Sequence, residues 1–205
     1  MDKTIIVNLS LQESPVPIGY SSNDESIPST DCSTIYPINA FLQSKCSSLD
    51  TVTVLLVGKN DPNGRVNHSI DQFTTEFGRN CASCGLSYRI IPVLVPYDAD
   101  LRTQKALIKQ LVELLQPNNE IISDITFGAK DFAIVLMSVL SFAIKHLDCT
   151  ADYILYREVF FQNGFPERPV IRNFAPLLHL TSLIYTLDTA DPSKAKKILE
   201  SVLSF

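Results

Sequence analysis

The feature that most constrains the fold of this chain is an alternation of short apolar segments with segments of helical periodicity. The apolar segments are rich in Val, Ile and Leu, as in strands buried on both faces, and cover residues 4–11, 51–57, 87–95, 120–126 and 153–156. The segments with helical spacing cover residues 34–49, 70–82, 100–115 and 131–147. Alternation with short connections predicts a Rossmann-like, doubly wound α/β domain with a mainly parallel sheet and helices on both faces.

Two regions depart from this alternation. Residues 12–33 are rich in Ser, Pro, Asn and Asp without periodicity, which predicts a long loop, either a lid or an irregular insertion. Residues 159–172 are aromatic and Pro-rich, which indicates a hairpin or an extended arm, and helices are expected at 176–187 and from 191 onward. We therefore divide the chain into a Rossmann domain, 1–158, and an arm with a C-terminal helical extension, 159–205.

The last predicted helix has an apolar stripe that continues to the final residue, Phe205. Two interpretations stay open. Either the helix docks on its own domain, or it leads from this domain into a further one. We accordingly assign residues 159–205 to dimerisation or to linkage with an effector domain.

Composition limits the kinds of partner. The chain has 205 residues, 45% of them hydrophobic, which fits one domain with a full core. A net charge of −5 argues against a broad surface for long nucleic acid, so any nucleotide site must be small and local. The longest apolar run, 132–144, is about half of a membrane span, and the N-terminus lacks the features of a signal peptide. We expect a cytoplasmic protein without membrane contact.

The cysteines predict reduced thiols rather than a metal site. There are five, an odd number, and only Cys81 and Cys84 form a C-x-x-C pair. Zinc needs a second pair at metal spacing, which Cys32, Cys46 and Cys149 do not supply. We expect no metal ion and no cofactor.

The connection after the strand at 120–126 carries the clearest candidate site. Gly128 can adopt positive φ and leaves room for a ligand, and the helix that follows presents free N–H groups. Lys130 adds a positive charge and Thr126 a hydroxyl, so the loop predicts an anion site. The residues assigned to it are Thr126, Phe127, Gly128, Ala129, Lys130 and Asp131. The loop matches neither a Walker A motif nor a dinucleotide fingerprint.

Asp124 precedes this loop and has two interpretations. It is either a catalytic acid or, as we favour, an acceptor of hydrogen bonds from loop amides that holds the turn in shape.

Other strand ends supply further candidates, because ligands in such sheets bind at the carboxyl ends of the strands. The polar or ligand-facing candidates are Asn8, Ser10, Leu11, Gln12, Tyr20, Lys59, Asn60, Arg157 and Glu158. No histidine lies in a candidate loop, so a general base is not evident.

The segment Asp124-Ile125-Thr126-Phe127-Gly128-Ala129-Lys130 resembles the D-x-T-x-G-x-K motif of CRISPR-associated Rossmann-fold (CARF) domains. Residues 36–40 are similar to the first helix of that family, and the resemblance covers residues 4–158. It implies a homodimer that binds cyclic oligoadenylate across a two-fold axis. On this basis Gly128 and Lys130 contact phosphate, Thr126 supports them, and Ser10 contacts a ribose or phosphate.

The resemblance leaves two functions open. The first is a sensor of cyclic tetra- or hexa-adenylate in type III CRISPR antiviral defence, which regulates an effector domain. The alternative is a ring nuclease that cleaves the same ligand, with Ser10 and Lys130 as the candidate catalytic residues. A nucleotide binder unrelated to that defence is a third, less supported interpretation. The segment 12–33 departs from the family pattern, which leaves the role of Ser10 open.

Overall fold

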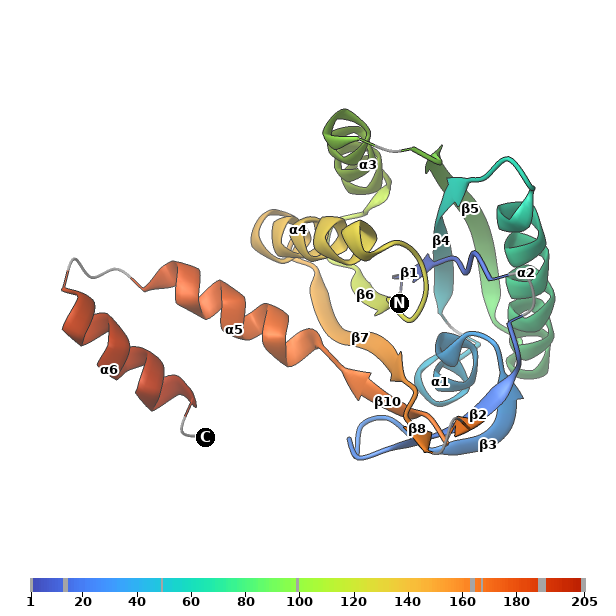
Figure 1. Cartoon of the computed structure of the whole chain (residues 1–205), viewed down its shortest axis with the longest axis horizontal. Helices are drawn as coiled ribbons and strands as arrows, with labels where there is room; N and C mark the ends of the chain where they lie inside the picture. The colour runs from blue at the N-terminus through green and yellow to red at the C-terminus, as the bar shows by residue number, and fades with distance from the viewer. Residues whose placement is uncertain are drawn as a thin grey trace.

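The computed structural model of the chain describes residues 2–12, 15–48, 50–98, 100–162, 165–166, 168–187 and 191–203 (Figure 1). Its strands are β1 (Asp2–Asn8), β2 (Ile18–Ser22), β3 (Thr30–Thr34), β4 (Thr51–Asn60), β5 (Ser87–Pro96), β6 (Glu120–Asp124), β7 (Thr150–Glu158), β8 (Phe161–Gln162), β9 (Phe165–Pro166) and β10 (Val170–Asn173). Its helices are α1 (Pro37–Lys45), α2 (Arg65–Cys84), α3 (Leu101–Leu114), α4 (Lys130–His146), α5 (Ala175–Thr186) and α6 (Pro192–Leu203).

Most strands form one eight-stranded sheet in the order β3-β2-β10-β7-β6-β1-β4-β5. The five strands from β7 to β5 are parallel, and β1 pairs with both β4 and β6. The chain winds from β1 through β4 to β5, then crosses to β6 and β7 on the other side of β1. The direction of winding therefore reverses beside β1, between β1 and β6.

Helices cover both faces of this sheet, as Figure 1 shows. Ile5 and Val7 of β1 pack in a core that includes residues of α1 and α2, whereas Ile6 packs with residues of α3, α4 and α5. Because β1 is buried on both sides, its sequence is almost continuously apolar. The predicted Rossmann-like α/β fold with a helical C-terminal part is confirmed.

The prediction of a long loop at 12–33 is wrong for much of that segment. Residues 18–22 form β2, which pairs in parallel with β10, and residues 30–34 form β3, which pairs antiparallel to β2. Tyr20 is 1% exposed and belongs to the core. Hydrogen bonds to β10, nearly 150 residues away, stabilise this edge of the sheet, and local periodicity does not reveal them. Residues 13–14 lie outside the described part of the chain.

Several predicted boundaries also shift. α1 begins at Pro37 rather than at 34, because Thr34 belongs to β3. α2 begins at Arg65, where the carboxylate of Asp61 accepts hydrogen bonds from the N–H groups of Asn63 and Val66. β4 extends to Asn60, so Lys59 and Asn60 lie at the end of a strand rather than in the turn after it.

The C-terminal part contributes to the main sheet. β8 and β9 pair antiparallel, so the hairpin interpretation of residues 159–172 is confirmed, and β10 pairs antiparallel to β7. Ala175 and Leu178 of α5 are buried in the core on the α3 and α4 side, whereas α6 buries none of its described residues. The division at residue 158 stays a prediction.

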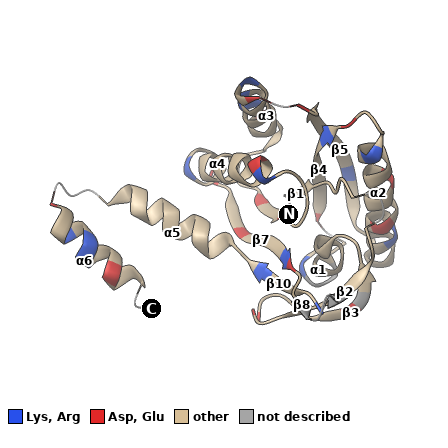
Figure 2. Cartoon of the chain, viewed as in Figure 1, with Lys and Arg blue, Asp and Glu red and all other residues tan. Residues whose placement is uncertain are grey.

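Among the described residues, no helix combines the length and the apolar character that crossing a membrane requires. Figure 2 shows positive and negative residues interspersed along the helices and strands of the sheet domain, whereas α5 carries neither.

Candidate functional site

The candidate loop lies where the winding of the sheet reverses. Residues 125–129 connect β6 to α4, next to the segment that follows β1. A hollow of about 350 Å³ separates the two segments and is lined by Ser10, Leu11, Gln12, Thr126, Phe127 and Gly128. This is the position at which open α/β sheets bind their ligands. The structure therefore brings together the candidates that follow the first and fourth predicted strands.

Gly128 has a backbone that other residues adopt only with strain. Its φ is +88°, and a Cβ atom added there would lie 2.9 Å from the Cβ atom of Asn8. Asn8 is 2% exposed, and its Nδ2 atom has no hydrogen-bond partner within the described structure. Glycine is thus needed at 128 both for the turn and for its close approach to β1.

Asp124 holds the loop in place. It is 1% exposed, and its Oδ1 accepts a hydrogen bond from the N–H of Thr126 at 3.0 Å. Its Oδ2 accepts another from the N–H of Ile38 at 3.1 Å. Burial raises the pKa of the Asp124 carboxyl above its ordinary value, although these hydrogen bonds and Arg157 oppose the rise. The predicted hydrogen bond to a loop amide is confirmed, and the carboxylate faces the protein interior.

Arg157, one of the strand-end candidates from the sequence, lies behind the loop. The backbone N–H of Arg157 donates to Thr126 Oγ1 at 3.0 Å, and its guanidinium carbon lies 5.1 Å from the centroid of the Phe127 ring. Burial lowers its pKa, while Asp124 and Glu76 oppose the change. Its Nε and Nη1 atoms find no acceptor among the described residues. The only sequence signal for it was a cation at a strand end.

The first turn of α4 has no side-chain cap, and of its N–H groups that of Phe132 already donates to the carbonyl oxygen of Ala129 at 3.0 Å. Ala129 occupies the N-cap position and supplies no side-chain hydrogen bond. Lys130, the first residue of the helix, is exposed. Amide groups and the helix dipole at such a position attract anions.

Lys59 and Asp131 lie beside this helix end and pair with each other. Their charged atoms are 3.9 Å apart, and Gln104 Nε2 donates to the same Asp131 oxygen at 3.1 Å. The Lys59 ammonium also lies 5.8 Å from the centroid of the Phe132 ring. Lys59 is therefore engaged by the protein, whereas Asn60 at the same strand end is exposed.

Ser10 lines the hollow between the segment after β1 and the loop after β6. The residue is fully buried, its N–H donates to the Tyr36 hydroxyl at 3.3 Å, and its Oγ accepts from the N–H of Gln12 at 3.1 Å. The Ser69 hydroxyl donates to its carbonyl oxygen. Burial raises the pKa of Tyr36 to about 12, so this phenol stays neutral at physiological pH. Leu11 is half-buried, and Gln12 is exposed at the rim.

A second hollow lies against the same loop. It measures about 330 Å³ and is lined by Ile125, Thr126, Phe127, Gly128, Ala129, Lys130, Ala133, Tyr156 and Phe174. Tyr156 and Phe174 are stacked, with ring centroids 5.3 Å apart and an interplanar angle of 19°. Neither ring was predicted from the sequence, because Tyr156 of β7 and Phe174 after β10 are brought together only by the pairing of these strands in the sheet. Neither hollow, as formed by the described residues, has a histidine in its lining.

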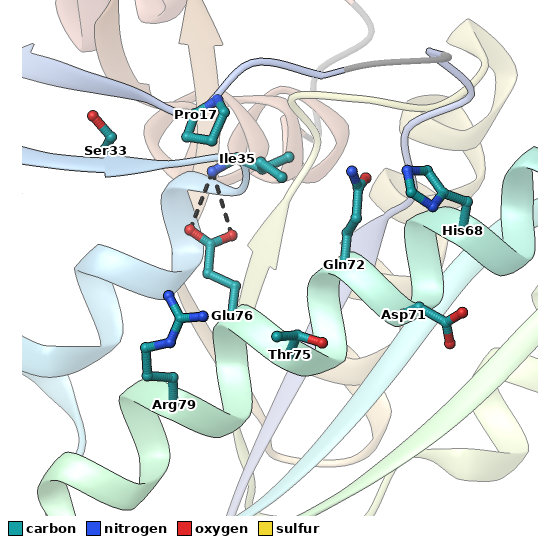
Figure 3. A pocket seen from close by; sticks show the side chains of 9 residues that line it. All are labelled: Pro17, Ser33, Ile35, His68, Asp71, Gln72, Thr75, Glu76 and Arg79. Atoms are coloured by element: carbon teal, nitrogen blue, oxygen red, sulfur yellow. Dashed lines mark hydrogen bonds between the residues drawn. The ribbon is translucent and has the colours of Figure 1, made fainter.

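A third hollow, of about 360 Å³, lies along α2 and is separate from the loop (Figure 3). Glu76 points from α2 to the start of α1, where it accepts hydrogen bonds from the N–H of Ile35 at 3.1 Å and from Asn39 Nδ2 at 2.8 Å. Its carboxylate is thus used to hold the β3 to α1 connection. Asp71 and Arg79 add opposite charges to the lining, which gives this hollow no selectivity for an anion.

The remaining sequence candidates lie elsewhere. Glu158 forms an ion pair with Arg172 of β10. Cys81 is buried and Cys84 is half-buried, and burial raises the pKa of Cys81 to about 12, which disfavours a reactive thiolate. In the described part of the chain, no group of three or more metal-ligating side chains could hold a metal ion.

Comparison with known proteins adds no relative: no protein-family model matches the chain, and no curated protein shows significant similarity to it. The loop and its hollows are therefore the features from which a function of this chain can be inferred.

Proposed function

We propose that this chain is a sensor domain that binds cyclic oligoadenylate, a cyclic tetra- or hexa-adenylate, in type III CRISPR antiviral defence. The observation that carries the proposal is the first turn of α4. There an N-cap without a side-chain hydrogen bond, the positive φ of Gly128 and the exposed Lys130 occur together where the sheet reverses its winding. Gly128 and Lys130 belong to the segment 124–130, which resembles the D-x-T-x-G-x-K motif. We place the sensor in the cytoplasm.

The chemistry of the turn favours a phosphodiester. Free amides and the helix dipole stabilise negative charge, and Lys130 adds a full positive charge at the same point. Gly128 lets the phosphate approach the backbone closely, while Asp124 holds the loop from the buried side. In this proposal Thr126, Phe127, Ala129 and Asp131 line the approach, and Ser10 and Leu11 form the opposite wall. Lys59 and Asn60 flank the turn.

A homodimer suits a ring-shaped ligand, because two copies of the loop present two helix ends to it. The surface that best suits a second copy lies on α4 and α5, next to the loop. Ile134, one turn after Lys130, is 71% exposed, Leu177 is 54% exposed and Tyr185 is 86% exposed. Together with neighbouring residues they line a groove of about 280 Å³. Large exposed apolar side chains in one place mark protein interfaces.

Ligand cleavage is the alternative. A ring nuclease needs groups that position the ribose 2′-hydroxyl and stabilise the developing charge. Lys130 is exposed and could stabilise charge, but Ser10 is buried and already bonded to Gln12. We therefore favour binding without cleavage, and the products of the binding experiment decide between the two.

The experiment is a calorimetric titration of the whole chain with cyclic tetra-adenylate and with cyclic hexa-adenylate, followed by chromatography of the recovered ligand. We expect one ring bound per dimer and recovered intact. Recovery of linear products would replace the sensor by a ring nuclease. Absence of binding to both rings would overturn the proposal.

A further inference from the structure

We propose that the hollow between Tyr156, Phe174 and the first turn of α4 is the site for a purine base of the ligand. This inference rests on the proposed function, since it assigns the base of a nucleotide whose phosphate lies at Lys130. Three features of the hollow support this site: its position, its aromatic wall and the distribution of charge around it.

The position follows from the alternation of β7. Ile154 packs in the core on the α3 and α4 side and Leu155 in the opposite core. The next residue, Tyr156, therefore returns to the α4 side, and Arg157 points to the α1 side. Accordingly, Tyr156 lines the hollow beside α4 and α5, whereas Arg157 contacts Phe127 from behind the loop. The loop thus separates two hollows, and only this one contains the Lys130 side of the helix end.

Tyr156 and Phe174 form a preorganised aromatic wall of the hollow. Tyr156 and Phe174 stack on each other, and the N–H of Phe174 donates to the carbonyl oxygen of Ile154 at 2.8 Å, which fixes the backbone of the second ring. Both rings are half-buried and line the hollow together with Phe127. Prearranged aromatic rings are the usual stacking platform for nucleobases.

The volume of the hollow and the charge of its lining residues suit a nucleotide. The volume of about 330 Å³ lies at the lower end of the range of about 300–1,000 Å³ for small-ligand sites. The small residues Ala129 and Ala133 also line the hollow and leave space in it. No described residue of the lining carries a carboxylate, and its single charged residue is Lys130. A lining that is aromatic on one side and cationic on the other fits a molecule with a flat apolar part and an anionic part, as in a nucleotide.

Tyr156 also offers a polar group to the base. Tyr156 is half-buried and lines the hollow, and a phenol can both accept and donate a hydrogen bond. A base that stacks here can therefore form one hydrogen bond with this hydroxyl.

The test separates the base from the phosphate. The whole chain is titrated with AMP and with ribose 5-phosphate, and the same titrations are made with Tyr156→Leu, Tyr156→Phe and Tyr97→Leu. Tyr97 follows β5, is 55% exposed and lines neither hollow beside the loop, so it serves as the matched control. We expect wild-type protein to bind AMP more tightly than ribose 5-phosphate. We expect Tyr156→Leu to weaken AMP binding by about 5- to 150-fold, the usual loss of one stacking partner. Binding of ribose 5-phosphate should not change, Tyr156→Phe should keep most of the preference, and Tyr97→Leu should keep all of it.

A second variant tests the same hollow independently, in case Tyr156→Leu does not fold. Ala133→Phe adds a ring to the hollow from α4 and leaves Tyr156 and Lys130 in place. We expect it to reduce AMP binding and to spare ribose 5-phosphate. If both variants fold and keep the preference for AMP, or lose both ligands equally, the base site is wrong.

Failure of this inference differs from failure of the proposed function. If wild-type protein binds cyclic adenylates in a Lys130-dependent way while Tyr156→Leu and Ala133→Phe bind as wild type, only the base site falls. If wild-type protein binds neither the rings nor AMP, both proposals fall together.

Discussion

The carboxylate of Asp124 accepts a hydrogen bond from the backbone N–H of Ile38 at 3.1 Å, across 86 residues of sequence. Its other oxygen holds the N–H of Thr126 at the beginning of the candidate loop. One buried side chain thus joins the start of α1 to the turn that begins α4. Through this connection the geometry of the proposed phosphate site depends on the packing of α1.

Replacement of Asp124 by Ala should destabilise the protein, because the buried N–H of Ile38 and the partly buried N–H of Thr126 would lose their acceptor. Each unsatisfied group costs about 1–3 kcal/mol. We expect urea unfolding to show a loss in that range or above it, and weaker binding of cyclic adenylate through a displaced loop. Wild-type stability would contradict the role assigned to this carboxylate.

Asp124 should also contribute to the pH dependence of stability. Burial raises its folded-state pKa, so the folded protein holds this proton more tightly than the unfolded chain does. The resulting stabilisation is full below the ordinary carboxyl pKa of about 3.9 and is lost as pH rises through the folded-state value. We expect Asp124→Asn to lack this component when urea unfolding is measured across a pH series. The same pH profile in both proteins would refute it.

Replacement of Gly128 by Ala should impair both stability and ligand binding. The added methyl group would lie 2.9 Å from Asn8 Cβ, and the left-handed backbone adds strain of about 1–2 kcal/mol. Gly64→Ala is a matched control, since its φ is +69° and nothing lies within 4 Å of the added atom. We expect the thermal unfolding temperature to fall further for Gly128→Ala than for Gly64→Ala. Equal losses would mean that the approach to β1 is unimportant.

Replacement of Lys130 by Ala should weaken anion binding and leave stability unchanged, because the side chain is exposed. Lys105→Ala, on the exposed surface of α3, removes the same charge away from the loop. We expect only Lys130→Ala to lower affinity for cyclic adenylate in calorimetry, and to lower the salt dependence of that affinity. Equal effects of the two substitutions would indicate a general charge effect instead of a site.

Replacement of Asp131 by Asn should strengthen anion binding. It removes a negative charge from the first turn of α4 and releases Lys59 from its ion pair. The same change should cost about 0.3–1 kcal/mol of stability, because an acidic residue near a helix N-terminus is favourable. Titrations and urea unfolding of one variant therefore give changes of opposite direction. Weaker binding by Asp131→Asn would show that the carboxylate itself contacts the ligand.

Replacement of Ile134 by Asp should prevent the proposed dimer. Ile134 is 71% exposed, so a charge there costs the monomer little but would be buried between two copies. We expect sedimentation to show a dimer for wild-type protein and a monomer for the variant. A monomeric wild type would remove the two-fold symmetric part of the proposal.

The candidate site was predictable in part from the sequence. Gly128 and Lys130 are recognisable because a glycine and a lysine at the start of an apolar helix have a local meaning. The state of the neighbouring groups was not predictable: Lys59 is paired with Asp131, and Ser10 is fully buried. Those facts depend on which side chains meet across the sheet edge, and no local pattern records such contacts.

For the fold, the sequence by itself determined the parallel central strands and the helices between them, because burial on both faces of a sheet requires continuous β-branched runs and each covering helix requires an apolar stripe. Only the tertiary structure decided that residues 18–22 join β10, that Asp124 and Glu76 hold the start of α1, and that Tyr156 and Phe174 form one wall. The physical reason is that strand pairing and buried hydrogen bonds satisfy backbone groups with partners far away in the chain, whereas periodicity reports only which face of an element is buried.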